Sequence, residues 1–289
     1  MRRRIYNEQP ISRLAIWARR IAFFSLATTL IAVVIVRSGA LDIVPALSTL
    51  AGALVLACVA ILLALGAVIV IWREGTGGGR HAATAVFIGL ALIAYPLYLG
   101  IKGSRLPAIS DITTDPIDPP QFDAIARLRP RDANPVVYAG LYAAEQQHAA
   151  YSDIEPDDTT STPQEAFDAA MKVIVKRRWR IVDTRPPQPG PPLRAGAASG
   201  RDGIIEAVAR TPILGFRDDV VVRIRPTSDG ARIDVRSASR YGRNDIGTNA
   251  SRVRNLIDDI DDVLAAPVPE KKAPPPPRQP APKGAAAKR

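Results

Sequence analysis

The chain has 289 residues, of which 47% are hydrophobic, and a net charge of +10. This charge does not indicate a nucleic-acid-binding face, because residues 1–20 and 267–289 each carry a net charge of +5 and residues 21–266 sum to zero. The single cysteine, Cys58, excludes a disulfide within the chain. We therefore expect a folded middle that is stabilised by its core and lies between two basic ends.

The first third of the chain holds three apolar segments that are long enough to cross a membrane. Residues 21–36 lie between Arg20 and Arg37 and reach about 24 Å as a helix, less than the roughly 30 Å of a bilayer core. Trp17 is suited to the interface and the flanking arginines can extend toward water, so we expect this span to begin near residue 15. The predicted membrane region, 15–101, therefore has spans at 15–37, 46–72 and 82–101.

A cleaved signal peptide is the alternative for the first segment, because Arg2, Arg3 and Arg4 resemble the basic start of such a peptide. Two further apolar segments come after it, which a signal peptide does not explain. Membrane spans are therefore the preferred interpretation.

The positive-inside rule gives an orientation. Residues 1–20 carry six arginines, whereas the loop after the first span holds only Arg37 and Asp42 as charged residues. The loop after the second span holds Arg73 and Arg80. We therefore expect a cytoplasmic N-terminus and, after three spans, a C-terminal domain on the periplasmic side of a bacterial inner membrane.

The rest of the chain divides into three parts by composition. Residues 102–135 are rich in proline and lack apolar periodicity, which indicates a tether, with one or two helical turns near residues 123–128. Residues 136–266 are expected to form the folded domain. The tail, 267–289, contains proline, alanine and lysine and is expected to be disordered.

Within the domain, the predicted elements alternate between helix and strand patterns. A helix begins at Thr162, where Thr162, Pro163 and Glu165 form a capping box. A Pro- and Gly-rich loop at 185–202 separates the first predicted strand from the others, and a final helix follows them at 247–264. The predicted strands are 179–183, 203–211, 217–225 and 232–239. This order predicts an α+β domain with an antiparallel four-stranded sheet and helices on one face.

The strands alternate between apolar and charged residues, as a sheet with one buried face requires. Val220, Val222 and Ile224 point toward the helices, whereas Asp219 and Arg223 point away from them. The predicted open face is thus charged, and it continues into a turn that leads to a helix N-terminus, a natural anion site. Cross-strand ion pairing on a wet surface is the alternative to ligand binding. The candidate binding residues are Asp219, Arg223, Arg225, Asp234, Arg236, Arg240, Asp245, Asn249 and Arg252.

Several segments of this part of the chain resemble the domain-of-unknown-function 1499 family over roughly residues 120–265. The segments that carry the resemblance are GFRDDVVVR at 215–223, IDVRSASR at 233–240, GRNDIGTNASR at 242–252, AYSDI at 150–154 and the helix that begins at Thr162. The resemblance implies a small domain that some members carry behind membrane spans. It implies no established activity and therefore no catalytic residue.

The residues give little support to an enzyme. His148 is the one histidine after the predicted spans, so we expect neither a zinc site nor another metal or cofactor. Asp218 and Asp219 are adjacent on a strand and point to opposite faces, so they cannot act as a carboxylate pair. Gly77, Gly78 and Gly79 lie between two spans and do not form a phosphate loop.

Three functional hypotheses remain. The first is a membrane-anchored binding or assembly domain whose arginine-rich face recognises an anionic ligand or an envelope protein. The second is a structural envelope component without a small-molecule ligand. The third is a hydrolase that depends on Asp219, Asp234 or Asp245. In each of them the lipid bilayer is a partner.

Overall fold

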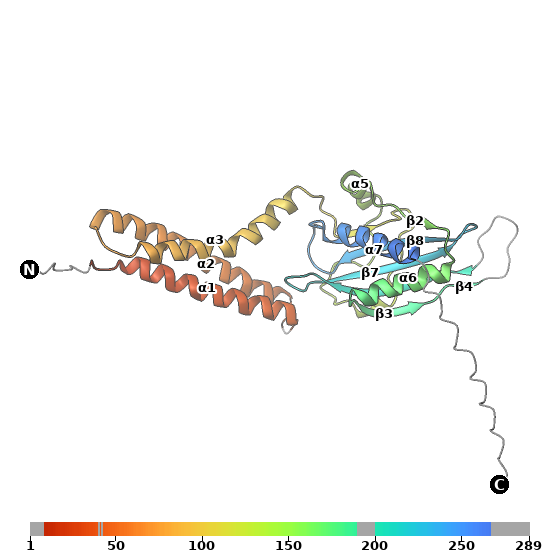
Figure 1. Ribbon diagram of the computed structural model, residues 1–289, viewed down its shortest axis with the longest axis horizontal. Coiled ribbons are helices and arrows are strands. Elements are labelled where there is room, and N and C mark those ends of the chain that lie inside the picture. The colour runs from red at the N-terminus through yellow and green to blue at the C-terminus, as the bar shows by residue number, and fades with distance from the viewer. Residues whose placement is uncertain (1–8, 40, 42, 190–199, 267–289) are drawn as a thin grey trace, which may run out of the picture.

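The computed structural model describes residues 9–39, 41, 43–189 and 200–266. Its first three helices are α1 (Arg13–Ser38), α2 (Ile43–Glu74) and α3 (Gly79–Ser104), and all three are long and apolar enough to cross a membrane. They form one bundle, with the α+β domain at one end (Figure 1). The three predicted spans are thus confirmed as candidate membrane helices. The predicted disordered tail lies outside the described residues.

Alanines form the contacts within this bundle. Buried alanines of all three helices pack together and let the backbones approach closely, among them Ala18, Ala64 and Ala85. Large apolar side chains point outward instead; Phe24 is 63% exposed and Phe87 is 74% exposed. Such a surface suits contact with lipid rather than with water.

The domain is built on an antiparallel sheet with the strand order β1-β8-β7-β6-β3, in which β2 also pairs with β8. The four predicted strands are present, and two strands of three residues each, β1 and β2, were not predicted. The loop predicted at 185–202 contains a further two-residue pair, β4 (Gln188–Pro189) with β5 (Gly200–Arg201). The strands of the sheet are β1 (Asp111–Thr113), β2 (Asp157–Thr159), β3 (Arg180–Arg185), β6 (Gly203–Arg210), β7 (Arg217–Pro226) and β8 (Ala231–Ser239).

Two long helices cover the first face of the sheet, as predicted. They are α6 (Pro163–Lys176) and α7 (Thr248–Ala265) (Figure 1). The capping box of α6 is confirmed, because the Thr162 hydroxyl accepts from the Glu165 amide at 3.3 Å and the Glu165 carboxylate accepts from the Thr162 amide at 2.9 Å. The core between helices and sheet includes the inward-facing side chains of β7 predicted above.

The second face of the sheet carries Glu206, Val208, Asp219, Val221, Arg223, Asp234, Arg236 and Ala238, and it is covered too. The short helix α4 (Ala124–Leu128) places Ile125 on it, and Phe122 packs against the same apolar patch. The helix α5 (Gly140–Ala150) follows α4, and its Gln147 side chain forms hydrogen bonds with the backbone of Thr113. The proline-rich segment that was predicted to be a tether is therefore packed on the sheet.

The expectation of an open, wet face is wrong for this reason. Asp219, Asp234 and Arg236 are each 0% exposed. Alternating charge usually indicates a solvated surface, but here the proline-rich segment brings its own aspartates and its own apolar side chains onto the face. We call residues 109–138 the covering segment.

The domain also contacts the ends of the membrane helices. The Arg37 guanidinium, at the end of α1, donates to the carbonyls of Pro212 at 2.5 Å and Ile213 at 3.3 Å in the β6–β7 loop. The Asn244 amide donates to the Gly103 carbonyl near the end of α3 at 3.3 Å. Contacts with two helix ends fix how the domain sits on the bundle.

Candidate functional site

Arg236 fastens the covering segment to the second face. Its guanidinium binds the Asp111 carboxylate through Nε at 3.0 Å and through Nη2 at 2.7 Å. Two carbonyls of the covering segment, those of Pro120 at 2.9 Å and Val136 at 2.7 Å, accept its remaining hydrogen bonds. The cation also lies over the Phe122 ring, 4.7 Å from its centroid. Arg236 thus holds three points of the covering segment at once.

A second group surrounds Asp234, and we call it the Asp234 cluster: Arg223, Arg225, Arg232, Asp234, Asp115 and Asp118. Arg223 and Asp234 are cross-strand neighbours on β7 and β8, and Arg223 Nη2 lies 2.9 Å from the carboxylate. Arg225 Nη2 lies 2.8 Å from both Asp234 and Asp115. Burial would raise the pKa of Asp115, but hydrogen bonds from the Asp118 amide and from Arg225 bring that pKa below its usual value. Three cations and three carboxylates balance each other here.

Asp219 lies between two arginines. Arg240 Nη2 and Arg129 Nε lie 2.7 Å and 2.8 Å from its two carboxylate oxygens. Nearby, the Glu206 carboxylate accepts from the backbone amides at 123, 124 and 125, which are the free donors at the start of α4. Both buried carboxylates are therefore compensated by specific donors, and both help to hold the covering segment.

Asp245, Asn249 and Arg252 do not join this face. The Asn249 carbonyl accepts from the Ser237 hydroxyl at 2.8 Å, and Arg252 Nη2 lies 2.5 Å from Asp218 on the helix-covered side of the sheet. Burial raises the pKa of Asp218 above its usual value. The sheet therefore separates the nine predicted residues into two groups, and they do not line one pocket.

The anion site predicted at the last helix is filled by the chain itself. The Asp245 carboxylate accepts from the backbone amides of Asn249 at 2.9 Å and Ala250 at 3.1 Å, in the first turn of α7. Burial raises the pKa of Asp245, and these hydrogen bonds act against the rise. The N-cap residue of α7 is Gly247, which has no side chain, and Asp245 supplies the negative acceptor that a helix N-terminus favours.

The chemistry open to these side chains is limited by their partners. Each carboxylate of the hydrolase hypothesis is held by arginines or by backbone amides, so none is positioned as a free base. Within the part of the chain that the structure describes, no three metal-ligating side chains come together. Ligand binding by the nine residues stays a prediction.

Sequence reasoning missed the residues that complete the network. Asp111, Asp115 and Asp118 supply carboxylates, and Arg129 supplies a cation, all from the covering segment. The recurrence of aspartates in this segment was a signal, because strand arginines that become buried need carboxylate partners. High proline content together with the lack of apolar periodicity led to the prediction of a tether.

The family model for a protein of unknown function, DUF1499, matches residues 111–260. The chain belongs to the DUF1499 family. The match begins at Asp111, the partner of Arg236, and therefore includes all but the first two residues of the covering segment, the sheet and most of α7. No curated protein and no solved structure matches the chain. The DUF1499 domain thus comprises both groups of buried charges, and the membrane helices precede it.

Proposed function

We propose that this DUF1499 protein is a bacterial inner-membrane protein that presents a rigid domain at the periplasmic surface, where it acts as a binding or assembly domain. The contact between Arg37 and the β6–β7 loop carries this proposal, because it holds the domain at the ends of the spans. A domain seated in this way has a fixed orientation relative to the bilayer. A domain held in one orientation is suited to recognise a ligand or a protein at the membrane surface.

The periplasmic placement rests on the distribution of positive charge. Six arginines lie within residues 1–20, and Arg73 at the end of α2 and Arg80 at the start of α3 flank the short connection between these two helices. Short loops with such an excess stay in the cytoplasm. The domain follows the third helix and therefore belongs on the other side.

Labelling of single cysteines tests this placement. In a Cys58→Ala background, Ser228→Cys lies in the exposed β7–β8 turn, and Glu74→Cys lies at the opposite, exposed end of α2. We expect a membrane-impermeant maleimide to label Ser228→Cys in intact spheroplasts and Glu74→Cys only after lysis. The reverse pattern would contradict the orientation but not the membrane anchoring.

The arginine-rich face offers one place where an anionic partner could enter. The Arg225 side chain is 28% exposed, and its partner Asp118 is 62% exposed. An anion that replaced Asp118 would meet Arg225 and Arg223 without opening the buried core. In this proposal Arg236 supports the fold, and Arg225 is the contact for an anionic ligand or envelope partner.

A structural envelope component is the second candidate, and the charge balance of the Asp234 cluster favours it. The two candidates differ in what Arg225→Ala does. Pull-down from solubilised envelopes with the full-length chain should lose a specific partner on Arg225→Ala if the face binds one. An unchanged partner set together with a lower thermal stability would leave the face a structural role alone.

A further inference from the structure

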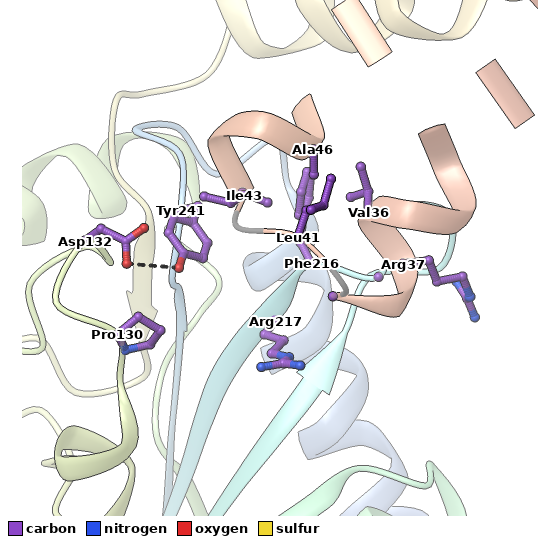
Figure 2. A pocket seen from close by; sticks show the side chains of 12 residues that line it. Val36, Arg37, Leu41, Ile43, Ala46, Pro130, Asp132, Phe216, Arg217 and Tyr241 are labelled. Carbon is purple, nitrogen blue, oxygen red and sulfur yellow. Dashed lines mark hydrogen bonds between the residues drawn. The ribbon is translucent and has the colours of Figure 1, made fainter. Parts of the chain in front are cut away.

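A hollow of about 190 Å³ lies between the ends of the membrane helices and the DUF1499 domain, and we call it the junction hollow. The bundle contributes Val36, Leu41, Ile43 and Ala46, and the domain contributes Phe216, Arg217, Asp132 and Tyr241. Figure 2 shows Asp132 and Tyr241 facing each other on one side, with Arg217 beneath Phe216 and the helix ends. Because the candidate spans α1 and α2 meet the domain here, a bilayer around them would place its headgroups at the junction hollow.

Arg217 brings an uncompensated positive charge to this place. Among the described residues no carboxylate forms a salt bridge with it, and its Nη2 lies close to Gly39 in the α1–α2 loop. Burial lowers its pKa, and then Arg210, Arg240 and Arg180 lower it further, because like charges disfavour another cation. Such a cluster stabilises an anion placed beside it.

The lining has two halves of different chemistry. The bundle side chains of the lining and Phe216 are apolar, which suits the first acyl carbons of a lipid. Arg217 offers a planar fork that matches a phosphate. The Asp132 carboxylate accepts from the Tyr241 hydroxyl at 3.4 Å, so this side would repel a phosphate and instead suits the hydroxyl groups of a headgroup.

We propose that the junction hollow binds an anionic phospholipid, with its phosphate on Arg217 and its hydroxylated headgroup toward Asp132 and Tyr241. Arg37 is a positioning residue here, because its guanidinium is occupied by the carbonyls of the β6–β7 loop and holds that loop in place. A free phosphate would leave the apolar half of the junction hollow unfilled, so the lipid is the source that fits. The inference requires a membrane-inserted chain but not a particular orientation.

The test measures lipid retention by the full-length protein in detergent. Dioleoylphosphatidylglycerol and dioleoylphosphatidylcholine are titrated separately, and bound lipid is followed by native mass spectrometry. We expect selective retention of phosphatidylglycerol and a loss of at least about tenfold in its affinity for Arg217→Gln, which keeps the stem but removes the charge. Arg201→Ala, an exposed arginine of β5 outside the junction hollow, is the matched control and should bind as the wild type does.

A second variant guards against a folding defect. Leu41→Glu adds a negative charge to the lining at a side chain that is 48% exposed, and it should reduce retention in the same way. Equal retention of both lipids, or undiminished phosphatidylglycerol binding by both variants, would overturn the proposal. Displacement of the lipid by glycerol phosphate at equal concentration would also overturn it, because the site would then serve a soluble anion.

Discussion

Replacing Arg236 with alanine should strongly destabilise the DUF1499 domain. The side chain is 0% exposed and makes five hydrogen bonds, three of them to Asp111, whose side chain is 14% exposed. Removal of one partner from a buried ion pair leaves the other charge unpaired and costs about 3–5 kcal/mol. For a domain of this size that corresponds to a fall in melting temperature of roughly 6–20 °C.

Tryptophan fluorescence can follow this change within the full-length protein. Of the three tryptophans only Trp179 lies in the domain, where it packs against the core, so Trp17→Phe and Trp72→Phe leave a reporter specific to the domain. Removing Asp111 as well should recover part of the loss, because no unpaired charge then remains.

Arg254→Ala provides the matched control for this prediction. Arg254 also pairs with an aspartate, Asp153, but their side chains are 36% and 58% exposed. Exposed pairs contribute up to about 1 kcal/mol. A loss for Arg236→Ala no greater than that for Arg254→Ala would refute the reasoning and would mean that the covering segment is held by other contacts.

Three further predictions concern single sites, all measured by unfolding of the same reporter chain. Thr162→Ala should cost about 1 kcal/mol by removing the cap of α6, whereas Thr162→Ser should restore most of it. Gly230→Ala should cost more than about 2 kcal/mol, because φ is +154° and the new methyl group would lie 2.1 Å from the Thr159 carbonyl oxygen. An unchanged stability of this variant would contradict the conformation of the turn. Burial and the nearby Asp157 raise the pKa of Asp261 to about 6, so the folded domain binds that proton more tightly than the unfolded chain. Stability should therefore rise as the pH falls from about 7 to about 5, and this rise should be smaller in Asp261→Asn. An unchanged rise in that variant would contradict the assignment.

Much of this fold was predictable because local signals were strong. The capping box at Thr162, the alternation along β7 and the long apolar runs each reflect a periodicity that one element alone determines. The short strands β1 and β2 have three residues each, too few to show a pattern, and they depend on pairing with β8.

The second face could not be predicted from the strands alone. Arg236 and Asp234 have the same sequence pattern whether they meet water or buried aspartates. Which applies depends on where the proline-rich segment lies, and that position is set by contacts over more than a hundred residues, such as Arg236 with Asp111. Residue order along one strand carries no information about such a partner.

The separation of Asp245, Asn249 and Arg252 from the other candidates has a similar cause. The helix that carries Asn249 and Arg252 covers the first face, so these side chains approach Ser237 and Asp218 and not Arg236. The sequence predicted that Asp218 and Asp219 point to opposite faces of the sheet. It did not predict that the residues after β8 would lie on the face of Asp218.

The seating of the DUF1499 domain on the membrane helices is the central claim, and a disulfide tests it most directly. A Cβ atom at Gly103 would lie 3.2 Å from Ile246 Cγ2, close enough for a cysteine pair. In a Cys58→Ala background in native membranes, Gly103→Cys with Ile246→Cys should cross-link almost completely under mild oxidation. Gly103→Cys with Ser228→Cys, in the turn at the far end of β7, should not. Absence of the first cross-link, or equal yields from the two pairs, would mean that the domain moves freely on its linker and would contradict the account.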